Sequence, residues 1–414
     1  MKERSVSSKD AFTRRCPSGW MAAAALLIVM LLFGGCSIGP PVLKDSVLGY
    51  DETTADLELK MLLLNIARRD AGVPIHFTVA SSIAATFDWT TSTGAGVDHT
   101  QADRKFWSSA FNFNLGFSAS ENPTFSIYPV AGEEFTERLL TPIKEELFNI
   151  VMFQDARFDE TVRLLSSGIE IMNFEDGSYK RVISNDPKRP EEYKEFRQMI
   201  SHMQWLHDKK QLFVRRLVFK EPLLEDFPDA PTPEDIIEAI SEGLRWQEQP
   251  DGNYMLTRFT SGRLVVTNYD PLALEDRVRY ELNERIKNKP DSFIHVDIAP
   301  EGPGGNFPIY GAIKMRSMVQ IIDFVAAGTR RYPEFHVPKD PRTGELDQNP
   351  VYTLQINTTN EKPSLPTSSI KYNGKWYSVA DTEWDRANFR LVAWLFQASV
   401  GEIQAPGLPI TISK

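Results

Sequence analysis

Cysteine is almost absent from this chain of 414 residues, which holds Cys16 and Cys36 and none after them. Residues 37–414 therefore contain no disulfide, no cysteine ligand for a metal and no cysteine nucleophile. A fold of this segment has to be stabilised by its core. Hydrophobic residues make up 42% of the chain and include 25 phenylalanines, which predicts a sizeable core and argues against disorder.

The sequence also lacks the common catalytic signatures. It has no Gly-x-Ser-x-Gly elbow, no His-Glu-x-x-His metal motif and no phosphate loop that ends in Gly-Lys-Ser/Thr. Histidine is scarce, and the six residues are scattered: His76, His99, His202, His207, His295 and His336. We therefore expect no catalytic residue, no metal site and no cofactor, and we predict a protein that is not an enzyme.

An apolar run long enough to cross a membrane is missing as well. The run Met21–Phe33 has thirteen residues, fewer than the ~20 that a membrane-spanning helix needs. Basic residues precede it, and Gly34, Gly35 and Cys36 follow it. A basic region, a short apolar region and small residues at the end form a secretory signal. An uncleaved N-terminal anchor is the alternative interpretation.

The end of this segment, Phe33-Gly34-Gly35-Cys36, resembles the signal of bacterial lipoproteins. The resemblance implies that residues 1–35 are a signal peptide and that Cys36 is the lipidation site at the start of the mature chain. Ser37 stands where an aspartate favours retention in the inner membrane. The resemblance therefore implies a lipid anchor in the outer membrane of a Gram-negative bacterium, with the body on the periplasmic side.

The balance of charge is acidic. The formal net charge is −10, and residues 1–35 carry five basic and two acidic side chains, so the rest of the chain has a charge of about −13. This charge argues against nucleic acid as a partner and against wide contact with an anionic membrane. We expect the lipid at Cys36 to be the link to the membrane and other envelope proteins to be the partners. The oligomeric state stays open.

We predict four segments along the chain. Residues 1–35 form the signal peptide and residues 36–50 a lipidated tether. An N-terminal lobe covers residues 51–220 and a C-terminal lobe covers residues 232–414. Four prolines within Glu221–Pro233 make that stretch the expected linker between the lobes.

Helical and strand periodicities occur in both predicted lobes. Asp51–Asp70 has apolar residues at helical spacing, whereas Phe111–Phe117 alternates apolar and polar residues as a strand does. The polar stretch Thr90–Arg104 is expected to be a long loop. Asn373-Gly374 predicts a β-hairpin turn, and Trp384–Ala398 predicts a helix. We predict an α+β fold with mixed or antiparallel sheets covered by helices.

Two pairs of residues have a spacing that occurs in catalytic sites. His295 and Asp297 are two apart on an expected strand, so both side chains lie on one face, where a carboxylate can orient an imidazole for base catalysis or for a metal. Ser368 and Lys371 have the Ser-x-x-Lys spacing, but alternation along a strand places them on opposite faces. We assign a catalytic role to neither pair.

Two further features have a simpler structural interpretation. His202 and His207 are five apart on an expected helix, which is a poor spacing for one metal ion, and we expect two separate histidines. The glycines of Gly302–Gly305 are able to wrap a phosphate, but the segment neither follows a strand into a helix nor precedes a suitably spaced lysine. We expect a plain turn there.

Several segments look like those of a family of uncharacterised proteobacterial envelope lipoproteins. The segments are Leu62–Arg68, Asn122–Thr124, Gly132–Phe135, Leu140–Ile143, Lys314–Ser317, Tyr372–Tyr377 and Leu395–Ala398. The resemblance spans most of the chain beyond Cys36. It implies the envelope location and a fold that involves the whole chain, and it carries no activity.

The leading hypothesis is a structural or assembly component of a bacterial envelope complex for secretion, transport or a surface organelle. It is based on the expected lipid anchor, the large ordered body and the lack of a catalytic signature. Two alternatives stay open. One is an envelope hydrolase that uses His295 and Asp297, and the other is a protein that binds lipid or peptidoglycan fragments.

Overall fold

The computed structural model describes residues 39–99, 109–130, 132–173, 177–364, 368–400 and 410–412. Contacts divide the chain into two units between Leu57 and Glu58, inside helix α2 (Gly39–Asp70). The predicted signal peptide and Cys36 lie outside the described residues.

Residues 39–50, within the predicted tether, form the start of α2. Pro40 and Pro41 fit there because the first turn of a helix has no internal partner for their missing N–H groups. Further along, the hydroxyls of Thr53 and Thr54 donate to the carbonyls of Gly49 and Tyr50, one turn back.

The last turns of α2, in the second unit, confirm the helix predicted for this part of the chain. Leu62, Leu63 and Ile66 lie on one face and are almost fully buried in the core. The helix ends at Asp70, and Gly72 follows with a φ of 77°, which is a conformation that glycine adopts without strain.

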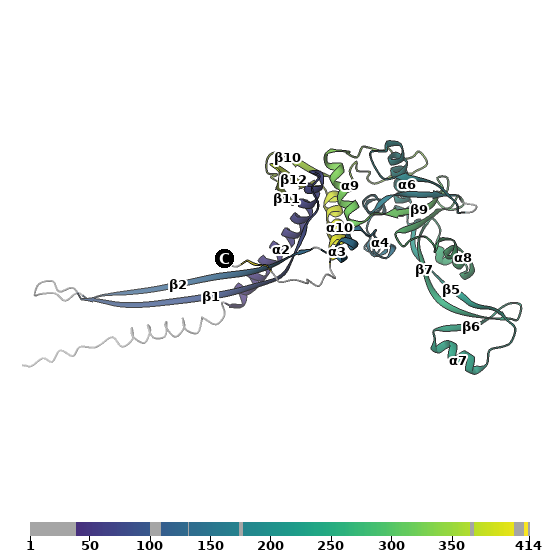
Figure 1. Cartoon of the computed structure of the whole chain (residues 1–414), viewed down its shortest axis with the longest axis horizontal. Coiled ribbons are helices and arrows are strands. Elements are labelled where there is room, and N and C mark those ends of the chain that lie inside the picture. The colour runs from purple at the N-terminus through teal and green to yellow at the C-terminus, as the bar shows by residue number, and fades with distance from the viewer. Residues whose placement is uncertain are drawn as a thin grey trace, which may run out of the picture. The chain divides into compact units, whose positions relative to one another are not determined.

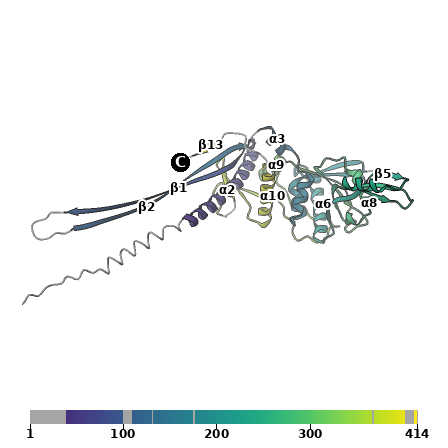
Figure 2. The same ribbon diagram turned by 90° about the horizontal axis from the view of Figure 1, so that it is seen from below.

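A long hairpin follows the helix. Strand β1 (Phe77–His99) pairs antiparallel with β2 (Ser109–Val130) from Phe77 opposite Val130 to His99 opposite Ser109. Both views show the two strands side by side along their length (Figures 1 and 2). At 3.3 Å per residue the paired ribbon is roughly 70 Å long. A third strand, β13 (Ile410–Ile412), pairs with Phe125–Ile127 of β2.

The expectation of a loop over Thr90–Arg104 is wrong for its first part, because residues 90–99 continue β1. Threonines occupy positions 90, 91 and 93, and β-branched residues of this kind favour strands even in a polar sequence. The strand predicted at Phe111–Phe117 is confirmed as part of β2.

The main sheet has seven strands in the described residues, in the order β4-β3-β9-β8-β7-β5 with β6 paired to β7. β7 and β8 are parallel and the other neighbours are antiparallel. The strands are β3 (Ser166–Met172), β4 (Tyr179–Ser184), β5 (Phe213–Phe227), β6 (Leu244–Glu248), β7 (Tyr254–Thr267), β8 (Phe293–Ile298) and β9 (Ile309–Met315). The predicted α+β class, with a mixed sheet packed with helices, is confirmed.

The expected linker is not a break in the structure. Glu221–Phe227 belong to β5, whose pairing with β7 shifts register on both sides of Leu224, and these irregularities let Pro222 lie within a strand. Strands from residues 166–184 and from residues 254–315 share one sheet. The contacts therefore divide the chain near residue 57 and not near residue 220.

The helices pack onto this sheet and onto one another. α5 contacts α6, α8 lies against β5 and β7, α7 lies against β6, and α9 contacts α3 and α10. The helices are α3 (Glu133–Leu140), α4 (Glu145–Met152), α5 (Phe158–Leu165), α6 (Pro190–Asp208), α7 (Pro233–Ser241), α8 (Asp276–Ile286), α9 (Met318–Arg330) and α10 (Glu383–Val400), with a short 3₁₀ turn η2 (Pro271–Ala273).

A small sheet completes the described fold. It has the order β10-β12-β11, formed by β10 (Ile356–Thr359), β11 (Ser369–Tyr372) and β12 (Lys375–Val379). Asn373 and Gly374 join β11 to β12 with φ angles of 46° and 80°, so the predicted hairpin turn is confirmed. The helix predicted at Trp384–Ala398 is also confirmed, within α10.

The loop between α9 and β10 is held by a buried polar network. The carboxylate of Glu334 accepts hydrogen bonds from the Tyr193 hydroxyl at 2.6 Å and from the Thr353 hydroxyl at 2.8 Å. Arg163 and Arg197 lie within 4 Å of the same carboxylate, and both donate to the carbonyl of Val351. The network joins this loop to α5 and α6.

Candidate functional site

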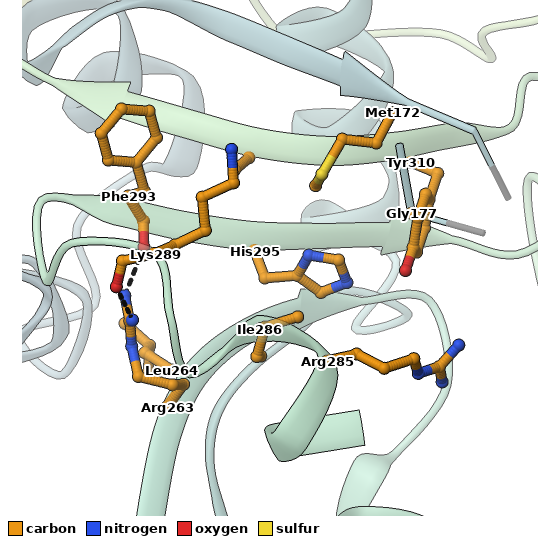
Figure 3. Close-up of a pocket in the computed structure, with 11 residues that line it drawn as sticks. Met172, Gly177, Arg263, Leu264, Arg285, Ile286, Lys289, Phe293, His295 and Tyr310 are labelled. Carbon is orange, nitrogen blue, oxygen red and sulfur yellow. Dashed lines mark hydrogen bonds between the residues drawn. The ribbon is translucent and has the colours of Figure 1, made fainter. Parts of the chain in front are cut away.

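A cavity of about 280 Å³ lies between the main sheet and α8 (Figure 3). The sheet builds its wall because alternate residues of neighbouring strands face the same side, and His295 of β8 lies opposite Ala312 of β9. The lining residues are Met172, Gly177, Arg263, Leu264, Arg285, Ile286, Lys289, Phe293, His295, Tyr310 and Ala312.

His295 is the most unusual group in this cavity. Its side chain is 4% exposed, and neither ring nitrogen makes a hydrogen bond of ordinary geometry among the described residues. The backbone of Gly311 interacts with the ring and acts to raise its pKa. The Tyr310 ring meets the imidazole edge-on, with 5.0 Å between the ring centroids. Burial lowers the pKa of His295 to about 3, and the charges of Arg285 and Arg263 act in the same direction. The imidazole is therefore neutral at neutral pH.

Two of the three basic side chains that line the cavity already form salt bridges with carboxylates. Arg263 donates to Glu145 at 2.8 Å and to the carbonyl of Phe293 at 2.8 Å. The Lys289 ammonium group is 2.6 Å from a carboxylate oxygen of Glu170. These two cations are parts of the scaffold.

Arg285 differs from them. It is exposed and makes no salt bridge within 4 Å among the residues that the structure describes, although its charge acts on the carboxylate of Asp297. In Figure 3 its guanidinium extends to the side of the cavity toward which the His295 ring and the Tyr310 hydroxyl also point. The cavity therefore combines a neutral imidazole with an exposed cation.

The remaining wall is apolar. Met172, Tyr310 and Ala312 form a small buried cluster against which Phe293 packs. This cluster is separate from the main core and lies beside the cavity. A molecule that enters would meet hydrocarbon and aromatic surface next to the polar groups.

The pairing of His295 with Asp297 on which the alternative hydrolase hypothesis depends is not formed. The Asp297 carboxylate accepts a hydrogen bond of 2.8 Å from the Tyr269 hydroxyl, and burial raises the pKa of this carboxyl. Asp297 is not among the residues that line the cavity. Asp297 therefore does not orient the imidazole as a general base, and the hydrolase hypothesis loses the geometry on which it depends.

The side chains of His202 and His207 lie in different surroundings, as their spacing predicts. One ring nitrogen of His202 pairs with the Thr343 hydroxyl at 3.1 Å and the other with the Gly304 carbonyl at 2.9 Å. His207 lies in another shallow depression, beside Phe153 and Arg215. Burial lowers the pKa of both histidines.

The glycine segment forms a turn. The N–H of Gly305 donates to the carbonyl of Gly302, and a Cβ on Gly305 would lie 2.1 Å from the Pro300 carbonyl oxygen. These glycines therefore allow close packing. Ser368 precedes β11, and Lys371 lies within it, so no helix start brings the two together.

No group of three or more histidine, cysteine or acidic side chains is arranged to hold a metal ion in the described ranges. Among the helices that the structure describes, none combines the length and the apolar character that crossing a membrane requires. No family model, curated protein or solved structure matches the chain. The resemblance to envelope lipoproteins stays a prediction.

Proposed function

We propose that this protein is a lipid-anchored structural component of a bacterial envelope assembly, and that it associates with further copies of itself through the hairpin of β1 and β2. The observation that carries the proposal is the length of this hairpin together with its unpaired outer edges. Within the described residues, β1 and β2 pair only with each other and, over three residues, with β13.

An isolated two-stranded ribbon is at best marginally stable in water, and its outer edges present unpaired N–H and C=O groups. Proteins that stay monomeric protect such edges with lysine, proline or short strands. β1 and β2 contain no lysine or arginine, and their only prolines are Pro123 and Pro129. The charged side chains of the hairpin are Asp88, Asp98 and Glu121, so the protection that lysine gives is absent and proline is confined to two positions.

The edge of β2 is protected only at the end that includes Pro123 and Pro129. β13 pairs with Phe125–Ile127, between the two prolines. Beyond them, Thr86–His99 pairs with Ser109–Asn122 over fourteen positions that contain no proline, and the described residues place no further strand on either edge. This segment, the distal hairpin, is the part that is open to pairing.

A second copy is the occupant that fits both edges. If the β1 edge of one copy pairs antiparallel with the β2 edge of the next, the two hairpins point in the same direction and match over the full fourteen residues. A common direction is also what anchoring of every copy in one membrane through Cys36 would require. Such head-to-tail contacts use a different edge of each copy.

Proline substitutions test the assembly. Pro123 is tolerated in β2 because its nitrogen faces away from β1, and Ala119 lies four residues earlier, so its N–H faces the same way. We expect Ala119→Pro to abolish oligomers of the detergent-extracted full chain, measured by light scattering after gel filtration, without loss of the hairpin. Ser120→Pro is the matched control, because it removes an N–H that faces β1 and should disrupt the hairpin itself.

A wild-type protein that is monomeric at micromolar concentration would contradict the assembly, and so would an Ala119→Pro variant with unchanged mass. The anchor is tested separately by mass spectrometry of the mature N-terminus and by Cys36→Ala. We expect this variant to lose lipid and membrane attachment. An unmodified Cys36 would overturn the anchor without bearing on the hairpin.

A further inference from the structure

We propose that the cavity at His295 is a binding site for a small carboxylic acid with an apolar body. The proposal is independent of the hairpin, since the two lie on different elements of the fold. It depends on three features of the cavity: a buried imidazole that no side chain binds, an exposed cation that forms no salt bridge among the described residues, and an apolar wall.

The imidazole indicates that a polar partner is missing. A neutral histidine has one N–H donor and one acceptor nitrogen. Both are buried at His295 without a hydrogen bond of ordinary geometry, and the backbone of Gly311 is the polar group that interacts with the ring. Since most buried polar groups in folded proteins are paired, the ring is placed to receive a group that enters the cavity.

Arg285 sets the charge of that group. Arg263 and Lys289 have carboxylate partners, so their charge is already balanced. Arg285 extends from α8 to the same cavity and makes no salt bridge within 4 Å among the described residues, and the carboxylate that feels its charge is that of Asp297, which does not line the cavity. A carboxylate can accept from this guanidinium and from the His295 N–H together, which combines two charge-assisted or polar contacts.

The wall and the volume limit the rest of the ligand. Met172, Phe293, Tyr310 and Ala312 present thioether, aromatic and methyl surface. A volume of about 280 Å³ lies near the lower end of the range for ligand pockets, roughly 300–1,000 Å³. The site therefore suits a short aliphatic or a single-ring carboxylic acid, and it is too small for a polymer fragment.

Three probes separate these requirements. Hexanoate has the carboxylate and the apolar body, hexanol has only the body, and acetate has only the charge. With histidines labelled with ¹³C in the full chain, hexanoate should shift the resonance of His295 in a saturable way, and His295→Gln assigns that resonance. We expect hexanol and acetate to bind at least tenfold more weakly.

Arg285→Gln tests the cation. This side chain is exposed, so the variant should fold, and it should lose at least tenfold in affinity for hexanoate while its affinity for hexanol is unchanged. Arg277→Gln is the matched control, because Arg277 is an exposed arginine of the same helix that pairs with Glu281 outside the cavity. It should bind hexanoate as the wild type does.

Three results would overturn the proposal: a His295 resonance that hexanoate does not shift, equal affinities for hexanoate and hexanol, or an Arg285→Gln variant that binds hexanoate normally. The first would mean that water alone fills the cavity. The second would mean that the cavity selects apolar surface without regard to charge. The third would place the carboxylate on another group.

Discussion

The hydroxyl of Tyr377 donates a hydrogen bond of 2.9 Å to Oδ2 of Asp70, although the two residues are 307 positions apart. Arg330 donates to the same oxygen through Nε at 2.7 Å. The Asp70 side chain is almost fully buried. This single carboxylate therefore joins the end of α2 to α9 and to the small sheet.

Tyr377→Phe should destabilise the fold by about 1–2 kcal/mol, because one hydrogen bond to a buried carboxylate is lost while Arg330 still balances its charge. Urea denaturation followed by circular dichroism measures the loss. Tyr179→Phe is the control, since Tyr179 is 61% exposed and should change stability by less than about 0.5 kcal/mol. Equal effects of the two changes would contradict the role of Asp70.

Glu334→Gln should lower the free energy of unfolding by more than Tyr377→Phe does. The change keeps the shape of the side chain but leaves Arg163 and Arg197 as buried cations without a counter-charge, and breaking a buried pair in this way costs about 3–5 kcal/mol. Glu345→Gln, which alters an exposed pair with Lys339, should be almost neutral. Unfolding midpoints that coincide for the two variants would show that the network contributes little.

Glu160 should make stability depend on pH. Burial raises the pKa of its carboxyl to about 7, and the neighbouring Asp159 acts in the same direction. The folded state therefore holds a proton that the unfolded state releases, and stability falls as pH rises from about 4.5 to about 7. Glu160→Gln should stabilise the protein at pH 8 by about 1–3 kcal/mol and change it little at pH 4.5.

The matched variant for this experiment is Glu238→Gln, at an exposed position of α7. It should shift the unfolding midpoint equally at both pH values. A Glu160→Gln variant whose effect is the same at pH 4.5 and pH 8 would show that this carboxyl titrates normally.

His295 should make stability depend on pH in the opposite direction, so that stability falls as the medium becomes acidic. Its pKa is lowered to about 3 in the folded protein, so the unfolded state takes up a proton first as the medium becomes acidic. Stability contributed by the neutral ring is present above about pH 6.5 and is lost as pH falls toward 3. His295→Gln should lose less stability than the wild type between pH 7.5 and pH 4.5, whereas the exposed His336→Gln should behave as the wild type. Parallel curves for all three proteins would contradict the lowered pKa.

The sequence alone was sufficient to predict elements whose conformation is decided by their own residues. Asn373 and Gly374 adopt the positive φ angles of the hairpin turn because few other residues do so at low cost. The same is true of α10, whose apolar residues repeat with the helical period. These elements depend little on distant parts of the chain.

Prediction failed where distant partners decide the structure. The prolines near residue 222 suggested a linker, but pairing with β7 extends β5 through them, and irregular register accommodates the ring. The polar residues after Thr90 suggested a loop, but the opposite strand holds them in β1. Neither partner can be recognised from the segment itself.

The candidate site was visible only in part. His295 stood out because it lies two residues from Asp297 on an expected strand, but the structure places Arg285 of α8, and not Asp297, in the lining of the same cavity. Nothing in the spacing of Arg285 indicates that α8 lies over β8. The sequence signal that was available is the alternation of Tyr310 and Ala312 on β9, which places both on one face beside His295.

The pairing of β13 with β2 has a consequence for the order in which the chain folds. Ile410–Ile412 follow the end of β2 by roughly 280 residues. At a synthesis rate of about 5–20 residues per second, β2 exists for about 15 to 55 s before its third strand is made. Until β13 is present the edge near Ile127 lacks its third strand, and the prolines on either side are the protection that is already in place.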